Sequence, residues 1–118
     1  MKLQYFFRRP EFPVLIINEN EIFVAKSAIF LLKIIDKHEF SRHDYYNLID
    51  CSNEGWAFYP KQYVISPLVM KKHWTKKEII QLYNNSKTIK DKGIEPLEER
   101  ILYKPFKQIF DIIVNTLR

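Results

Sequence analysis

Apolar residues near the N-terminus occur in short runs rich in β-branched and aromatic side chains, which is typical of strands. Pro10 separates the first run from the second, and Asn18-Glu19-Asn20 forms a turn signal between the second and the third. The second and third runs are therefore expected to form a hairpin. The predicted strands are 2–8, 12–18, 21–25 and the segment 55–66, in which Pro60 lies at a turn or on a sheet edge.

Other apolar residues recur at helical spacing. Ser27 is a suitable N-cap for a first helix whose apolar residues lie nearly all round, so we expect that helix to be covered on most sides. Ser41 is expected to cap a second helix, because Tyr45, Leu48 and Ile49 share one face at helical spacing. The polar stretch 84–93 is expected to be a loop or one short turn. The predicted helices are 28–37, 42–50, 76–84 and 105–117.

The order of these elements predicts an α+β fold. We expect a small antiparallel sheet of about four to five short strands, with three to four helices packed mainly on one face. The length of 118 residues indicates a single domain, 1–118, that is large enough to bury its own core.

The composition argues against several functional classes. Gly55 and Gly93 stand alone, so neither a P-loop nor a dinucleotide fingerprint is present, and no cofactor is expected. Cys51 is the single cysteine, which excludes an internal disulfide. The longest apolar runs are far shorter than the roughly 20 residues that cross a bilayer, and the N-terminus does not resemble a secretory signal. We therefore expect a cytoplasmic protein without membrane association.

The net charge of +5 is concentrated in one segment. Residues 71–92 contain seven lysines and only two acidic residues, Glu78 and Asp91, while the flanking parts of the chain are neutral overall. This basic helix-loop segment therefore carries the whole excess of positive charge, which suggests an acidic partner.

Within this segment, Trp74, Thr75, Glu78 and Leu82 resemble the opening of a Myb-type repeat over nine residues. The same residues also form a complete helix-start signal. Thr75 and Glu78 have the spacing of a capping box, and Trp74 and Ile79 have the spacing of a hydrophobic staple. The helix start alone therefore explains these four residues, but it does not explain the lysines beside them.

Two of the lysines, Lys76 and Lys77, occupy the first helical turn, where the helix dipole disfavours cations. At this position the lysines lie next to backbone N–H groups that have no partner within the helix, and the two together favour the binding of an anion. Our leading interpretation is a small non-enzymatic protein that binds a polyanion, with the nucleic-acid backbone as the first candidate. The candidate polyanion-binding residues are Lys71, Lys72, Lys76, Lys77, Lys87, Lys90 and Lys92.

A protein–protein interaction module of the inhibitor, immunity or adaptor type is the alternative. Its basic face would bind an acidic protein, or its C-terminal helix would pair with another copy in a homodimer, because that helix carries a wide apolar stripe. A central buried helix would explain the stripe equally well. The candidate interface residues are Phe106, Ile109, Phe110, Ile113 and Leu117.

Metal binding and catalysis have weaker support. The soft metal ligands are His38, His43, Cys51 and His73, and their spacing does not match a zinc motif, so no metal site is expected. An enzyme that uses His43, Asp44 or Cys51 is a third class, for which the sequence indicates no substrate.

Overall fold

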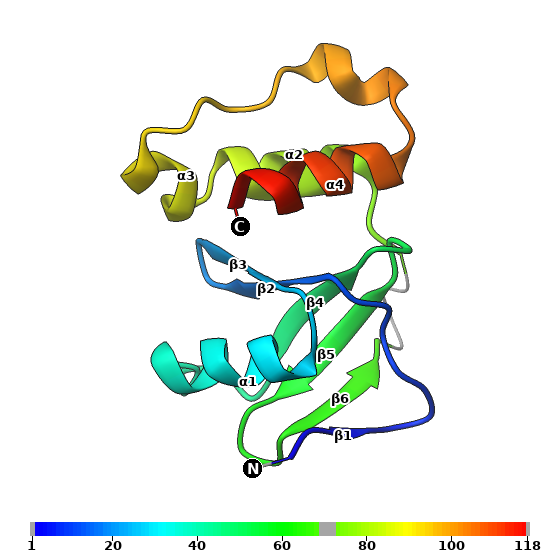
Figure 1. Ribbon diagram of the computed structural model, residues 1–118, viewed down its shortest axis with the longest axis vertical. Helices are drawn as coiled ribbons and strands as arrows, with labels where there is room; N and C mark the ends of the chain where they lie inside the picture. The colour runs from blue at the N-terminus through cyan, green and yellow to red at the C-terminus, as the bar shows by residue number, and fades with distance from the viewer. Residues whose placement is uncertain (1, 69–72, 118) are drawn as a thin grey trace.

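The computed structural model describes residues 2–68 and 73–117 and has an α+β fold (Figure 1). Its six strands are β1 (Gln4–Tyr5), β2 (Val14–Asn18), β3 (Glu21–Ala25), β4 (Tyr46–Asp50), β5 (Gly55–Tyr59) and β6 (Val64–Pro67). Its helices are α1 (Ala28–Lys37), α2 (Lys76–Asn84), α3 (Lys87–Lys92), the 3-10 helix η1 (Glu99–Tyr103) and α4 (Phe106–Leu117).

The strands form one mixed sheet in the order β1-β6-β5-β4-β2-β3. Five strands pair in antiparallel fashion, as predicted, but β1 pairs with β6 in parallel. The sheet is therefore larger than the predicted four to five strands. The predicted hairpin is confirmed, with Glu19 in its turn at a φ of 56°.

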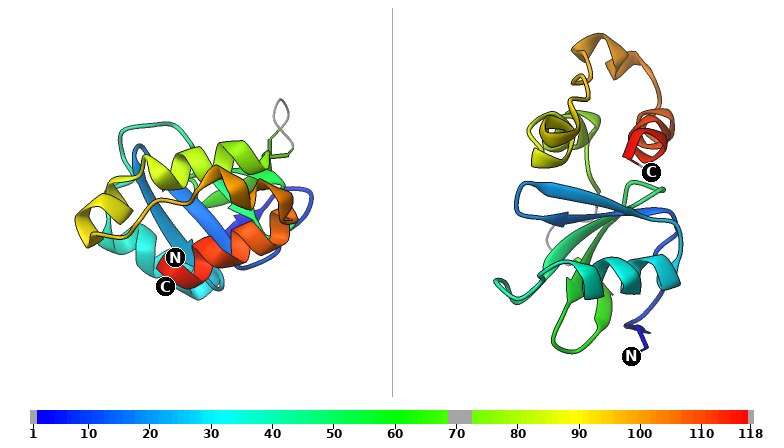
Figure 2. Two further views of the ribbon diagram at one scale, coloured as in Figure 1. Left: turned by 90° about the horizontal axis from the view of Figure 1, so that it is seen from above. Right: turned by 60° about the vertical axis from the view of Figure 1, so that its left-hand side comes forward.

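Alternating side chains of the strands separate two hydrophobic cores. Val14 and Ile16 of β2 face the core that α1 covers, whereas Leu15 and Ile17 face the core beneath α2, α3 and α4. Figure 2 shows α1 on one side of the β2–β3 hairpin and α2 with α4 on the other. Helices thus lie mainly on one face, as expected, and α1 is the exception.

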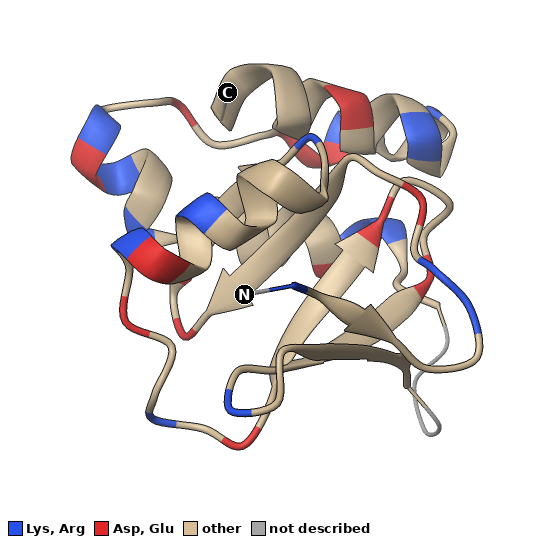
Figure 3. Cartoon of the chain, turned by 60° about the horizontal axis from the view of Figure 1, so that its bottom comes forward, with Lys and Arg blue, Asp and Glu red and all other residues tan. Residues whose placement is uncertain are grey.

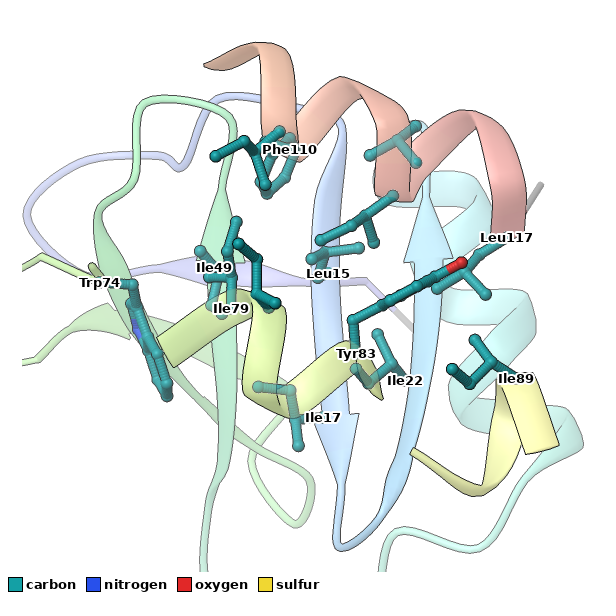
Figure 4. Packing of buried hydrophobic residues seen from close by; sticks show 14 residues of the cluster. Leu15, Ile17, Ile22, Ile49, Trp74, Ile79, Tyr83, Ile89, Phe110 and Leu117 are labelled. Carbon is teal, nitrogen blue, oxygen red and sulfur yellow. The ribbon is translucent and has the colours of Figure 1, made fainter. Parts of the chain in front are cut away.

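The core beneath α2, α3 and α4 contains the C-terminal helix (Figure 4). Phe110 and Leu117 of α4 pack with Tyr83 of α2 and with Leu15 of the sheet. The helix begins at Phe106, one residue after the predicted start, and Pro105 accepts hydrogen bonds from the first turn. The apolar stripe of this helix therefore packs against the core of the chain itself.

The segment 42–50 does not form the predicted helix. Tyr46–Asp50 is strand β4, which pairs with both β2 and β5. Leu48 points into the core of α1, and Ile49 points into the core of α2, α3 and α4. A strand buried on both faces has apolar residues at adjacent positions, and such a pattern also occurs on a helix face.

Helix α2 begins as predicted. The Thr75 hydroxyl accepts from the Glu78 N–H at 3.2 Å, and the Glu78 carboxylate accepts from the Thr75 N–H at 3.0 Å, which completes the capping box. The stretch predicted as a loop or one short turn contains α3, a helix of six residues. Ser86 caps this helix, Ile89 is buried in the core, and Gly93 ends it in the left-handed conformation with a φ of 65°.

Thr88, near the start of α3, also bonds to the outer edge of the sheet. The Thr88 hydroxyl accepts from the Ile22 N–H at 3.0 Å and donates to the Ile22 carbonyl at 3.3 Å. Strand β3 is the last strand of the sheet, so this side chain replaces a neighbouring strand at its edge.

Candidate binding surfaces

The five lysines of the basic segment that the structure describes do not form one patch. Lys71 and Lys72 lie outside the described residues. Lys76 and Lys77 begin α2, whereas Lys87, Lys90 and Lys92 belong to α3, which follows the other end of α2. The nine residues of α2 place these groups about 13 Å apart along the helix axis. Sequence proximity therefore overstated how closely these charges lie in space.

The two lysines at the start of α2 contact other parts of the chain. Lys76 is half-buried, and its Nζ donates to the carbonyl oxygen of Leu102 at 3.0 Å. Lys77 is exposed and borders a hollow of about 140 Å³ with Glu99. Because Lys76 bonds to a carbonyl, the geometry gives it a role in holding η1 over α2.

The three lysines of α3 are exposed. Lys87 borders a hollow of about 280 Å³ that Glu19, Glu21 and Glu39 also line. Asp91 lies between Lys90 and Lys92 on the same short helix. Figure 3 shows the mixed charges along this helix and around the rest of the chain.

The candidate interface on α4 is mostly inaccessible. Ile109, Phe110 and Ile113 are fully buried, Leu117 is buried, and Phe106 is half-buried against the same core. The four buried side chains are not available to a second copy of this fold, and intramolecular packing accounts for the stripe.

The candidate catalytic residues lie at separate places. His43 and Asp44 border a hollow of about 470 Å³ together with Glu19, whose carboxylate is 3.5 Å from His43 Nε2. Cys51 follows the opposite end of β4, roughly 16 Å away by the rise of that strand. Burial raises the pKa of the Cys51 thiol, which disfavours the reactive thiolate. The described residues therefore do not join Cys51 to a histidine base.

The remaining histidines have partners of other kinds. His38 lies against the ring of Phe23, with ring centroids 4.3 Å apart, and Nδ1 of His73 is 2.9 Å from Oδ1 of Asn53. Within residues 2–68 and 73–117, no three His, Cys, Asp or Glu side chains gather in a way that would hold a metal ion.

Helix α1 exposes apolar side chains that we expected to be covered. Leu31 and Ile35 are buried, but Ile29 is 67% exposed and Phe30 is 46% exposed. The prediction was wrong because, in the described part of the chain, the sheet covers one face of α1 and the opposite face meets solvent (Figure 2). Exposed apolar residues on one face can indicate an interaction surface.

A groove lies between this exposed side of α1 and strand β1. Its volume is about 650 Å³. Tyr5 lines it from the strand, and Ala28, Ile29 and Leu32 line it from the helix. Sequence reasoning did not identify this groove, because it combines residues that are more than twenty positions apart.

Two cations, Lys2 and Arg9, line the α1–β1 groove. Two more lie over the ring of Phe30 on α1, where Nζ of Lys26 is 5.9 Å and Nζ of Lys33 is 5.3 Å from the ring centroid. None of the described residues that line the groove is Asp or Glu. Figure 3 shows positive segments at the N-terminus, on α1 and on the loop after β1. We call the groove together with Lys26, Phe30 and Lys33 the α1–β1 surface.

Two charged residues next to this surface, Arg8 and Asp36, contact other residues of the chain. Arg8 forms an ion pair with Glu54 at 2.6 Å, and its guanidinium lies 5.0 Å from the ring centroid of Trp56. Asp36 of α1 accepts a hydrogen bond from the Tyr63 hydroxyl at 3.4 Å. The sequence did contain a signal for the cations of the α1–β1 surface, because Lys26 precedes and Lys33 lies within a helix that is apolar nearly all round.

Comparison of the chain with models of known protein families, with curated proteins and with solved structures found no match. Of the helices in the described part of the chain, none combines the length and apolar character needed to cross a bilayer. The functional argument therefore depends on the surfaces described above.

Proposed function

We propose that the protein is a non-enzymatic interaction module that binds an acidic protein partner through the α1–β1 surface. One observation carries this proposal: Lys2, Arg9 and the exposed side chain of Ile29 line the same groove, and none of the described residues that line it is Asp or Glu. Apolar contacts supply affinity at an interface, while complementary charge supplies orientation and a faster encounter.

A protein partner suits this surface better than single-stranded nucleic acid. Bases bind by stacking on exposed aromatic faces. Here Arg9 lies 5.1 Å from the ring centroid of Tyr5, and Lys26 and Lys33 lie over the ring of Phe30. Because the protein's own cations lie over these rings, a base would have to displace them first.

Polyanion binding through the basic segment is the second candidate function. It is favoured by the exposure of Lys87, Lys90 and Lys92 on α3. In this proposal, α3 contacts phosphates of a nucleic-acid backbone, with Lys77 contributing from the other end of α2.

Two charge-reversal variants separate these candidates. Arg9→Glu with Lys33→Glu alters the α1–β1 surface, and Lys90→Glu with Lys92→Glu lowers the net charge equally on α3. We expect an acidic protein to co-purify from the native cell with the wild type and with the α3 variant but not with the α1–β1 variant. The purified candidate should then bind with the same pattern in calorimetry.

Equal recovery of that protein with both variants would contradict the proposed function. Loss of binding only in the α3 variant, together with loss of its retention on heparin, would identify polyanion binding as the function instead.

A further inference from the structure

We propose that the α1–β1 groove takes an extended acidic segment of the partner, which inserts one large apolar side chain between β1 and α1. This inference rests on the proposed function and specifies its partner chemistry. It combines three properties of the groove: an open sheet edge, exposed apolar side chains and two lining cations.

The sheet edge lies along β1, which is the end strand. The N–H groups of Gln4 and Phe6 donate inward, to the carbonyls of Tyr63 and Ile65 at 2.9 Å each. Backbone groups alternate in direction along a strand, so those of Tyr5 point away from β6. An extended peptide that lies beside β1 would meet these groups and add a short strand to the sheet. At the opposite edge of the sheet, Thr88 already bonds to the N–H and the carbonyl of Ile22 in β3.

The hollow suits a single apolar anchor. Its volume of about 650 Å³ lies within the range of binding pockets. Leu32 forms part of the α1 core, whereas Ile29 remains 67% exposed at the rim. An aromatic or large aliphatic side chain between Tyr5 and Ile29 would cover both, and buried anchors of this kind dominate the affinity of interfaces.

The cations require acidic residues on both sides of that anchor. Lys2 precedes β1 and Arg9 follows it in the chain, and both line the groove. Carboxylates flanking the anchor would therefore meet a cation on either side of β1. A second copy is a poor occupant, because its own α1–β1 surface carries the same positive charges.

Two synthetic peptides test this inference. The first has a central tryptophan with four glutamates on each side, and the second has serine in place of the tryptophan. Both carry a fluorescein label, and fluorescence anisotropy measures their binding to the full-length protein. We expect the tryptophan peptide to bind at least about tenfold more tightly, because burial of the anchor adds to an identical charge.

Groove variants locate the anchor. Ala28→Trp fills the groove and should abolish the difference between the two peptides, whereas Gln108→Trp, a matched substitution at an exposed position of α4, should preserve it. Ile29→Ser alters an exposed rim residue without threatening the fold, and should reduce the preference several-fold even if Ala28→Trp does not fold.

Three outcomes would overturn the inference: equal binding of the two peptides, an unchanged preference in Ile29→Ser, or binding of phosphatidylserine vesicles but not of the peptides. The outcome for the proposed function is separate. If the Arg9→Glu and Lys33→Glu variant loses the cellular partner while Ile29→Ser and Ala28→Trp retain it, the acidic partner stands and the groove as its docking site fails.

Discussion

Asp50 is buried at the end of β4, and its carboxylate holds the turn into β5 together. Oδ1 accepts from the Ser52 N–H and hydroxyl and from the Glu54 N–H, at 2.7 to 3.0 Å. Oδ2 accepts from the Glu11 N–H at 3.2 Å and from Nε1 of Trp56 at 2.9 Å. The substitution Asp50→Asn keeps the shape of this side chain but removes the acceptor on one side.

The expected loss follows from the donors left without an acceptor. If the amide oxygen replaces Oδ1, the amide nitrogen faces the N–H groups of Glu11 and Trp56. A buried donor without a partner costs about 1–3 kcal/mol, so two such donors cost roughly 4 kcal/mol. Removal of a buried charge returns part of its desolvation free energy. We therefore expect Asp50→Asn to lower the free energy of unfolding by about 3 kcal/mol.

Urea unfolding at neutral pH, followed by circular dichroism and tryptophan fluorescence, measures this loss. Asp91→Asn is the matched control at an exposed position, and its effect should stay within about 0.5 kcal/mol. In a double-mutant cycle, Asp50→Asn and Trp56→Phe should couple by more than about 0.5 kcal/mol. A loss below about 1 kcal/mol for Asp50→Asn would refute the argument that the carboxylate organises this turn.

Two further predictions concern the sheet edge and alkaline pH. Thr88→Val should lower the free energy of unfolding by about 1–2 kcal/mol, because the Ile22 N–H loses its acceptor. Thr88→Ser keeps the hydroxyl and should retain most of the stability of the wild type. Equal urea midpoints for the two variants would contradict the role of the hydroxyl. Burial raises the pKa of Tyr83 above its ordinary value of 10.0, so its ionisation favours unfolding and the free energy of unfolding should fall as pH rises past that value. Tyr83→Phe should show a smaller fall between pH 8 and pH 10.5 in urea titrations, and an identical fall would count against this assignment.

The lysine segment illustrates how a fold changes the meaning of a charge cluster. Seven lysines within 22 residues suggest one strong patch, yet α2 separates the described members into two groups at its ends. Lys76 then bonds to a carbonyl oxygen, and Lys87 lies among glutamates from the β2–β3 turn and the loop after α1. The lysines remain candidates for polyanion binding, but as two smaller groups.

The α1–β1 surface shows the converse, because residues that are separated in the sequence come together in the fold. Its cations come from two separate segments of the chain, 2–9 and 26–33, and none of them belongs to the lysine-rich segment. The sequence did contain the apolar residues of α1, which we assigned to a covered helix. Only the arrangement of the sheet, which covers a single side of α1, leaves Ile29 and Phe30 exposed.

The sequence by itself determined the features that depend on neighbouring residues. The start of α2 follows from Thr75 and Glu78, whose hydrogen bonds close within one turn, and the β2–β3 hairpin follows from two β-prone runs around a short turn. The α+β class followed from the order of such elements. These interactions form between residues a few positions apart, so local patterns encode them.

The tertiary structure decided the features that depend on distant partners. Segment 46–50 is a strand because β2 and β5 pair with it on both sides, although its apolar spacing also suits a helix. Lys87–Lys92 forms a helix because Ile89 reaches the core. Burial against distant segments outweighs weak local preference, and the same packing determines which cations and apolar side chains share the α1–β1 surface.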